Sequence, residues 1–334
     1  MQRVVVTGLG TVSPIGNNVA AFWDSMRHDK GGIAPITKFD HSGSSVSVAA
    51  EVKDFDPSPV LDRRETQRMD FFSQYAVVAS VEAVEDSGYK IEDNAHRVGV
   101  LVSSGIGGLI EIEKGIRKMI EKGAKRIPPL FVPLTIGNMA SGNISMKLGI
   151  KGPSLDIVTA CASATNSIGE AFLKIKTGLL DACLAGGAEA TICEIGIGGF
   201  AALTALSTNQ DPATASRPFD KDRDGFVMGE GAGVLFLESL ESAQARGAHI
   251  YAELVGYGAN SDAYHMTAPT PDGSGAGECI KQALAMAGLS AEDVDYINAH
   301  GTSTPTNDKG ETQAIKYALG DAAYKVAVSS SKGH

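Results

Sequence analysis

Apolar runs typical of β-strands alternate with stretches of helical periodicity along the chain, and this alternation constrains the fold more than any other feature. The expected strands lie near residues 4–8, 97–103, 182–189, 229–238, 251–258, 294–299 and 326–331. The expected helices cover residues 18–26, 63–87, 109–123, 135–148, 240–246, 278–287 and 308–319, besides one that follows Cys161, and residues 125–133 form an irregular connection. The alternation predicts an α/β fold with parallel or mixed sheets and helices on both faces.

Cys161 lies where an expected strand passes into an expected helix. Leu155, Ile157 and Val158 precede it as a short apolar run typical of a buried strand. Its immediate neighbours are all small, namely Ala160, Ala162, Ser163 and Ala164. A helix N-terminus carries partial positive charge and free N–H groups, which favour a thiolate and can hold an oxyanion. The pattern therefore favours a nucleophilic cysteine over one buried only for packing.

Composition excludes several classes of function. Among 334 residues, 29 Lys and Arg stand against 39 Asp and Glu, and the net charge of −10 disfavours a general nucleic-acid binder. The four cysteines show no paired spacing, which argues against a zinc site or a disulfide framework, and Cys183 and Cys279 fit core packing. A strand starts at the N-terminus without a preceding signal peptide, and no apolar run is long enough for membrane insertion. We therefore expect a cytoplasmic protein.

Two glycine patterns bear on the fold. Gly8-Leu9-Gly10 follows a strand and is similar to a dinucleotide-binding turn, but Ser13 stands where the third glycine belongs and no acidic residue closes a second strand. A nicotinamide oxidoreductase is therefore a weak alternative. Residues 251–258 have a sequence pattern similar to that of residues 4–10, with two glycines two positions apart after an apolar run. This similarity suggests an internal repeat that begins near residue 250.

His300 follows the expected strand at residues 294–299, and the ends of such strands are where α/β sheets present chemistry. Thr302, Ser303 and Thr304 supply hydroxyls directly after it. A histidine in this position suits either base-assisted thiol attack or the holding of a thioester oxygen.

Four motifs in order carry a resemblance to a known family. They are Thr159-Ala160-Cys161-Ala162-Ser163, residues 217–220 with 224–226, residues 298–305, and Ser331-Lys332. Together they resemble the 3-oxoacyl-[acyl-carrier-protein] synthases, most closely the type II elongating enzymes of fatty-acid synthesis, within the thiolase-like superfamily. The resemblance runs from residue 3 to residue 334. It implies a thiolase-like fold, two related α/β halves in an α-β-α-β-α layered stack, and a homodimer.

The resemblance also implies roles for individual residues. Cys161 matches the acyl-accepting nucleophile, His300 the first of two catalytic histidines, and Lys332 the lysine that supports the second. The remaining matches are Thr302 and Thr304 to threonines that hold the phosphopantetheine arm, Ile106 and Phe200 to positions that line the acyl pocket, and Asp308 and Glu311 to acidic residues of a supporting network.

The implied reaction has two stages and needs no cofactor or metal, because acyl carrier protein delivers both substrates on its phosphopantetheine arm. Cys161 takes an acyl group, and malonyl-carrier protein then loses carbon dioxide and attacks the Cys161 thioester. Acyl carrier protein is acidic, so basic clusters are docking candidates. These clusters comprise Arg63, Arg64 and Arg68, and Lys122, Lys125 and Arg126.

The sequence departs from the family at its end. The family's second histidine lies in Lys-x-x-x-Gly-His, whereas the sequence here runs Lys332-Gly333-His334 and lacks the glycine-rich segment that follows. Either the catalytic histidine lies beyond His334, or three residues are absent before it. We expect an N-terminal half at residues 1–250 that carries the nucleophile, and an incomplete C-terminal half at residues 251–334 that carries His300.

Three alternative functions share this fold. A degradative thiolase needs a second cysteine near its C-terminus, and the loop at residues 300–304 favours the synthase. A non-catalytic chain-length partner of an aromatic polyketide synthase lacks the nucleophile, so Cys161 argues against it. A condensing polyketide synthase shares all the motifs and stays open. Acyl chain length is not fixed by the sequence.

Overall fold

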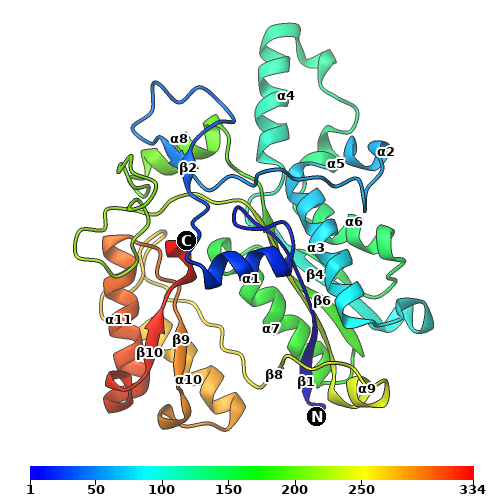
Figure 1. Ribbon diagram of the computed structural model, residues 1–334, viewed down its shortest axis with the longest axis vertical. Coiled ribbons are helices and arrows are strands. Elements are labelled where there is room, and N and C mark those ends of the chain that lie inside the picture. Colours follow the sequence, from blue (N-terminus) through cyan, green and yellow to red (C-terminus); the bar gives the residue numbers. More distant parts are fainter. The chain divides into compact units, whose positions relative to one another are not determined.

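A six-stranded mixed sheet forms the centre of the larger of two structural units in the computed structural model, which describes residues 1–334 (Figure 1). Its strand order is β5-β4-β6-β7-β1-β8. The strands are β1 (Val4–Val12), β4 (Val98–Ser103), β5 (Ser154–Leu155), β6 (Ala182–Glu189), β7 (Gly231–Ser239) and β8 (Ala252–Leu254). β4 is parallel to β5 and β6, and the other pairs are antiparallel. The prediction of a mixed sheet is confirmed.

Helices cover both faces of this sheet (Figure 1). Alternate residues of β4, namely Val98, Val100 and Val102, share a buried core with α3 (Phe71–Ser87) and α6 (Met139–Leu148). The other face packs against α7 (Ser163–Lys176), the helix that follows Cys161. Strand residues alternate between faces, and every residue of β4 is buried, so the strand is covered on both of its sides.

The glycines of β1 explain the motif that resembles a dinucleotide turn. β1 continues through Gly8 and Gly10, and neither residue forms a phosphate-binding turn. A Cβ atom on Gly8 would lie 2.0 Å from the Ala83 carbonyl oxygen, and one on Gly10 would lie 1.8 Å from that of Ala79. The glycines therefore let α3 press directly on the strand, and the nicotinamide-binding alternative is wrong.

The smaller unit consists of Ile33–Ala49, Gly198–Met228 and Val255–His334; the larger consists of Met1–Gly32, Ala50–Ile197 and Gly229–Leu254. In the smaller unit, α10 (Ser274–Ala287) packs on α11 (Pro305–Leu319), and β9 (Tyr296–Asn298) runs parallel to β10 (Ala327–Ser329). A small core forms from Ile315, Leu319 and Ala322, with Ile280, Leu284 and Ile297 packed against it.

The smaller unit repeats the glycine contact of the larger one. A Cβ atom on Gly256 would lie 2.2 Å from the Ala283 carbonyl oxygen, and one on Gly258 would lie 2.0 Å from that of Cys279. Each unit thus has a pair of glycines two residues apart. The two glycines of a pair contact backbone carbonyls that are four residues apart on a single helix, α3 in the larger unit and α10 in the smaller one. This equivalence supports the internal repeat expected from residue 250 onward.

The remaining elements complete the two units. They are α1 (Val19–Arg27), β2 (Ala34–Pro35), β3 (Val48–Ala49), α2 (Arg63–Thr66), α4 (Leu109–Lys122), α5 (Phe131–Thr135), α8 (Glu194–Ala202) and α9 (Leu240–Ala245). Short 3₁₀ turns lie at Ile91–Asp93, Ala95–Arg97, Ala124–Arg126, Ala160–Ala162, Ala291–Asp293, Gly320–Tyr324 and Ser331–Gly333. No helix is both long and apolar enough to cross a membrane.

Several sequence-based expectations are wrong in detail. Residues 63–87 form two helices rather than one, because Asp62 caps α2 and Asp70 starts α3 anew. The expected irregular stretch at 125–133 contains a 3₁₀ turn and the start of α5, while α6 begins at Met139. The strand expected at 251–258 is only β8, Ala252–Leu254.

The buried strand expected before Cys161 is also wrong. β5 covers only Ser154–Leu155 and lies at an edge of the sheet. Leu155 is 42% exposed and Val158 59% exposed. An edge strand has a neighbour on one side only, so its apolar residues need not be covered within the chain.

Candidate active site

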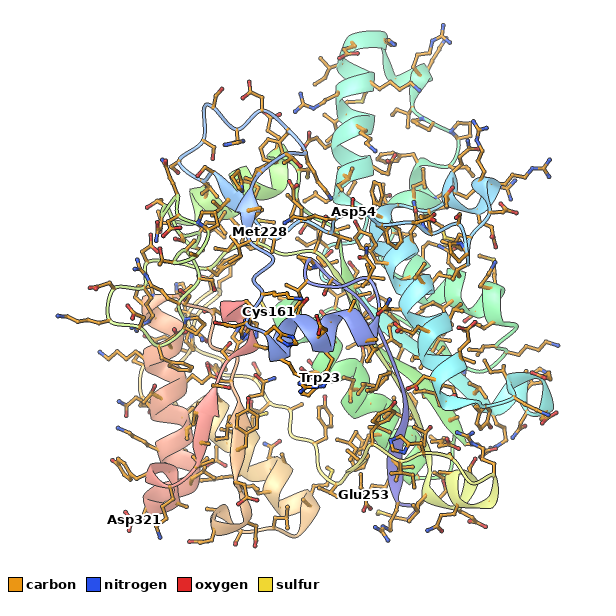
Figure 2. All side chains as sticks on the ribbon, viewed as in Figure 1. Trp23, Asp54, Cys161, Met228, Glu253 and Asp321 are labelled. Carbon is orange, nitrogen blue, oxygen red and sulfur yellow. The ribbon has the colours of Figure 1, made fainter.

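Cys161 lies exposed on a tight 3₁₀ turn, Ala160–Ala162, at the start of α7 (Figure 2). The Thr159 N–H donates to Ser163 Oγ at 2.9 Å, and that hydroxyl donates to the Ala160 carbonyl at 2.7 Å. Ser163 is itself buried. The buried Ser163 hydroxyl therefore fixes the backbone of the turn, while the Cys161 thiol stays exposed to solvent.

Ala160 has a φ of 51°, in the left-handed region that non-glycine residues rarely adopt. Such a conformation costs on the order of 1–3 kcal/mol and persists only where its surroundings impose it. The sharp reversal resembles the strained elbow that presents nucleophiles in other enzymes. The first turn of α7 has no side-chain cap, and the Ser163 N–H donates to the Ala160 carbonyl. The other backbone N–H groups at a helix start are donors of the kind that can hold a developing oxyanion.

Buried hydroxyls tie the segment before Cys161 to the sheet. Ser103 at the end of β4 shares a 2.6 Å hydrogen bond with Ser167 of α7, and its Oγ accepts the Ile157 N–H at 2.8 Å. Both serines are buried. The chain that approaches the nucleophile is thus fixed to the strand end and to the helix at once.

A glycine-rich turn, residues 104–108, follows β4 and carries Ile106, whose side chain is 42% exposed. Two carboxylates lie against this turn. Glu189 accepts the Ser104 hydroxyl and the Gly105 N–H, each at 2.9 Å, and Asp156 accepts the Ser104 N–H at 3.1 Å. Burial raises the pKa of Glu189 to about 7 and raises the pKa of Asp156 as well.

In the smaller unit, His300 follows β9, and Glu311 of α11 holds its backbone. The carboxylate accepts the N–H groups of His300 and Gly301, each at 2.7 Å. Gly301 has a φ of 40°, and a Cβ atom there would lie 2.4 Å from that of Ser330. Only glycine fits this close approach, which fixes the direction in which the chain leaves His300.

Desolvation lowers the pKa of His300, and the Lys332 ammonium lowers it further, although part of the residue is accessible to solvent and the Glu311 and Asp308 carboxylates oppose both effects. The imidazole is therefore biased towards its neutral form, which offers one N–H donor and one lone pair. A neutral donor of this kind can hold an enolate or a thioester oxygen.

The hydroxyls after His300 have separate roles in the loop. Thr302 and Thr304 share a hydrogen bond at 2.9 Å, and Thr304 Oγ1 also caps α11 by accepting the Asn307 N–H. Ser303 is fully buried with a φ of 69°, and its hydroxyl accepts the Arg217 N–H. Pro305 at the first helical position suits the start of α11.

Asp308 anchors the loop at residues 217–226 to α11. It is 1% exposed, accepts the Phe219 N–H at 2.8 Å and pairs with Arg223 at 3.3 Å. The Lys332 N–H donates to Ser330 Oγ, and its carbonyl accepts the Ser216 hydroxyl. Ser330 Oγ also donates to the Gly301 carbonyl at 2.9 Å, so the loop after His300 is joined to the segment that carries Lys332.

Phe200 lies on α8, half-buried, with its ring edge-on to Phe226 at a centroid distance of 5.5 Å. It belongs to the smaller unit, as do His300, Thr302, Thr304 and Lys332. The larger unit holds Cys161 and Ile106.

The six basic residues also belong to the larger unit and are all exposed. Arg63 and Arg64 lie on α2 and Arg68 just after it; Lys122 ends α4, and Lys125 and Arg126 lie on the 3₁₀ turn that follows. None of the six forms an ion pair. No group of three or more His, Cys, Asp or Glu side chains could hold a metal ion.

Sequence reasoning gave no role to Glu189 and Asp156. The available signal was a glutamate at the end of an otherwise apolar strand, Ala182–Glu189, beside a second glycine-rich turn. A carboxylate in that position lies at the edge of the sheet where the neighbouring β4 also ends.

An exposed cysteine on a strained turn before an uncapped helix, in an α/β fold built from two related units, defines an acyl-transferring enzyme of the thiolase-like class. The family model "Beta-ketoacyl synthase, N-terminal domain" matches residues 1–243, and "Beta-ketoacyl synthase, C-terminal domain" matches residues 251–334. The chain belongs to the beta-ketoacyl synthase family.

Relatives named 3-oxoacyl-[acyl-carrier-protein] synthase 2 agree with this assignment. One from Staphylococcus aureus (strain N315) is 52% identical over 332 residues, 99% of this chain and 80% of the relative. One from Synechocystis sp. (strain ATCC 27184 / PCC 6803 / Kazusa) is 53% identical over 333 residues with the same coverage.

Solved structures confirm the thiolase-like fold. The ishigamide ketosynthase/chain length factor is 37% identical with a TM-score of 0.92, covering 99% of this chain and 81% of that one. The AntDE:AntF complex, a type II PKS acyl-carrier protein with its ketosynthase bound to the hexaketide, is 34% identical with a TM-score of 0.90 at the same coverage.

Proposed function

We propose that this chain performs the decarboxylative condensation of malonyl-acyl carrier protein with an enzyme-bound acyl thioester, and so lengthens an acyl chain by two carbons in fatty-acid synthesis. The observation that carries the proposal is the exposed Cys161 on its strained turn before the uncapped first turn of α7. The relatives at 52–53% identity bear the name of this activity. The enzyme is then an acyltransferase that needs no cofactor beyond the phosphopantetheine arm of its substrates.

In the first stage, the Cys161 thiolate attacks the acyl thioester carbonyl, and backbone N–H groups at the start of α7 stabilise the oxyanion. The pantetheine thiol leaves and the acyl group stays on Cys161. Ile106, exposed on its turn, and Phe200 are proposed to line the acyl pocket. Thr302 and Thr304 hydrogen-bond to each other through their hydroxyls. They are proposed to hold the pantetheine arm with the hydrogen-bonding capacity that remains on these hydroxyls.

In the second stage, malonyl-carrier protein loses carbon dioxide, and the resulting enolate attacks the Cys161 thioester carbonyl. The acyl C–S bond breaks, the Cys161 thiolate is released, and the 3-oxoacyl product stays on the carrier protein. A neutral His300 suits this stage, because its N–H can hold the enolate oxygen without supplying a full proton. We assign Lys332 the support of a second histidine, in keeping with its effect on the charge of His300. The C-terminal half proposed at residues 251–334 carries both residues, and the half at 1–250 carries Cys161.

Acyl carrier protein is the proposed partner, and the docking surface is proposed to include Arg63, Arg64, Arg68, Lys125 and Arg126, with Lys122 beside them. Their exposure and lack of ion pairs support this assignment, because cations without partners are free to meet an acidic protein. The AntDE:AntF structure holds an acyl-carrier protein with its ketosynthase. A cytoplasmic location follows from the proposed substrates.

We further propose a homodimer. Apolar side chains are exposed on the edge strand β5, on the segment that follows it, and on α4 and α5: Leu155 at 42%, Val158 at 59%, Ile120 at 77% and Val132 at 64%. Exposed apolar area on this scale is typical of a contact surface. Analytical ultracentrifugation of the protein and of Val158→Asp tests it, because a charge at the interface shifts a dimer towards monomer and leaves a monomer unchanged.

The second candidate is a condensing ketosynthase of a polyketide pathway, favoured by the likeness to AntDE:AntF. Intact-protein mass spectrometry after incubation with acyl-carrier protein thioesters, followed by malonyl-carrier protein, tests the proposal. We expect one acyl adduct on the protein and none on Cys161→Ala. After malonyl-carrier protein is added, we expect the adduct to disappear and the carrier protein to hold a product extended by a single two-carbon unit. Repeated extension without release would favour the polyketide alternative, and the absence of any adduct on folded protein would overturn both.

A further inference from the structure

Glu189 at the end of β6 lies against the turn that presents Ile106, and its carboxylate determines how that turn is folded. One carboxylate oxygen accepts the Ser104 hydroxyl and the other the Gly105 N–H, both at 2.9 Å, and the Ile106 N–H also bonds to it. Three consecutive residues of the turn therefore depend on one side chain.

The turn has few other ties. Asp156 accepts the Ser104 N–H at 3.1 Å, and the Gly107 N–H donates to Ser104 Oγ at 2.8 Å. Ser104 is 2% exposed, so its hydroxyl has no access to solvent as a substitute partner. Without Glu189, the N–H groups of Gly105 and Ile106 would need new acceptors, and the turn would have to move to find them.

The same turn touches the chain beside the nucleophile. A Cβ atom on Gly105 would lie 3.0 Å from Glu189 Oε2 and 3.6 Å from the carbonyl oxygen of Ala160. Gly105 is thus confined between the Glu189 carboxylate and the residue that precedes Cys161. A displacement of the turn is transmitted both to Ile106 and to the space next to the thiol.

We propose that Glu189 is a positioning residue that sets which acyl chain lengths Cys161 accepts, because it fixes the turn that carries Ile106. The proposal rests on the proposed roles of Cys161 and Ile106. It also explains why a carboxylate occupies this position. Glu189 is partly buried near a second carboxylate, Asp156, and forms no ion pair, and such an unfavourable site for charge is typical of a functional role.

The test measures the rate at which Cys161 is acylated by short and by long straight-chain acyl-carrier protein thioesters, using intact-protein mass. The readout is the ratio of the two rates. We expect Glu189→Ala to change this ratio by about threefold or more, since single pocket contacts alter discrimination between homologues by such factors. We expect Glu189→Gln, which keeps an acceptor oxygen, to restore the ratio towards that of the parent.

Glu238→Ala is the matched control. Glu238 is a fully buried carboxylate in the same sheet, but it bonds Thr7, Ser242 and Arg246, far along the chain from the turn. We expect this variant to lose stability and to keep the parent ratio. Gly105→Ala serves as a second test of the turn if Glu189→Ala does not fold, because its Cβ would press on Glu189 from the other side.

An unchanged ratio in folded Glu189→Ala, or an equal change in Glu238→Ala, would overturn the proposal. Failure of the proposed function gives a different result: the parent would not be acylated, or Cys161→Ala would be acylated as fast as the parent. In that case the role assigned to Glu189 is overturned with it.

Discussion

The Glu311 carboxylate accepts the backbone N–H groups of both His300 and Gly301, each at 2.7 Å. One side chain from the second turn of α11 thereby sets the direction in which the His300 side chain leaves the end of β9. Charge-assisted bonds of this kind are worth about 1.5–3 kcal/mol each. The position of His300 thus depends on a residue that need not touch the substrate.

Glu311→Gln tests this dependence. The amide keeps one acceptor oxygen but places an N–H₂ group against a backbone donor, so we expect His300 to shift and the rate of malonyl decarboxylation to fall about tenfold or more. Acylation of Cys161 should change little, because the two half-reactions can be timed separately by mass. Glu292→Gln, on an exposed 3₁₀ turn of the same unit, is the control. Equal loss in both half-reactions would contradict a specific effect on His300.

Charge reversal tests the docking surface. We expect the combined variant Arg63→Glu, Arg64→Glu and Arg68→Glu to raise KM for acyl-carrier protein substrates and to reduce the salt dependence of kcat/KM. Activity with a pantetheine thioester that lacks the protein should be retained. Lys90→Glu, exposed beyond the opposite end of α3, is the control. If both variants raise KM alike, general net charge rather than docking is responsible.

Two capping aspartates predict opposite responses to pH. Burial raises the pKa of Asp70 to about 6, so the folded state binds its proton more tightly than the unfolded state between about pH 4 and pH 6. Stability from this group therefore falls as pH rises through that window, by up to roughly 3 kcal/mol. The free energy of unfolding of the parent minus that of Asp70→Asn, measured by urea titration, should therefore decrease from about pH 4 to about pH 6.

Asp62 behaves in the reverse sense. Hydrogen bonds from the Glu65 and Arg64 N–H groups lower the pKa of Asp62. Its contribution to the stability of the folded state is therefore present above about pH 4 and is lost as the pH falls further. The difference between the parent and Asp62→Asn should therefore shrink in acid. The same slope with pH for both variants would contradict this contrast between a buried and an exposed cap.

The glycine contacts predict a large loss of stability. Gly10→Ala places a Cβ 1.8 Å from a carbonyl of α3, and Gly258→Ala places one 2.0 Å from a carbonyl of α10. We expect each to cost about 3 kcal/mol or more, because backbone rather than a flexible side chain must move. Gly43→Ala, with nothing within 4 Å of the added atom, should be close to neutral in thermal unfolding. A neutral Gly10→Ala would contradict the close packing of α3.

Local pattern predicted much of the fold. Helical spacing predicted α7 correctly, because a helix that rests on one face of a sheet must repeat its apolar residues every three to four positions. The break inside residues 63–87 was missed because both of its halves are helical and only the capping geometry of Asp70 separates them. The apolar run before Cys161 was read as buried because sequence does not reveal that β5 lies at an edge.

The candidate site was predicted only in part. Chemistry-bearing side chains in small-residue or glycine-rich turns, such as Cys161 and His300, give a signal in the sequence itself. Glu189 gives almost none, because its role comes from lying across two strand ends that are more than eighty residues apart along the chain. Contacts between neighbouring strands of this kind follow from topology, which periodicity alone does not specify.

The division of the chain has a consequence for how the protein is made. The smaller unit needs Ile33–Ala49 and Gly198–Met228 as well as everything after Val255, whereas the larger unit is complete once Leu254 has been synthesised. At typical translation rates of roughly 5–20 residues per second, two early segments wait on the order of ten seconds for the remainder of their unit, Val255–His334. During that interval a finished Cys-bearing unit carries β2 and β3, which pair only with each other, without the rest of the smaller unit. Slow translation or a holding chaperone should therefore matter more for the yield of this protein than the stability of its larger sheet suggests.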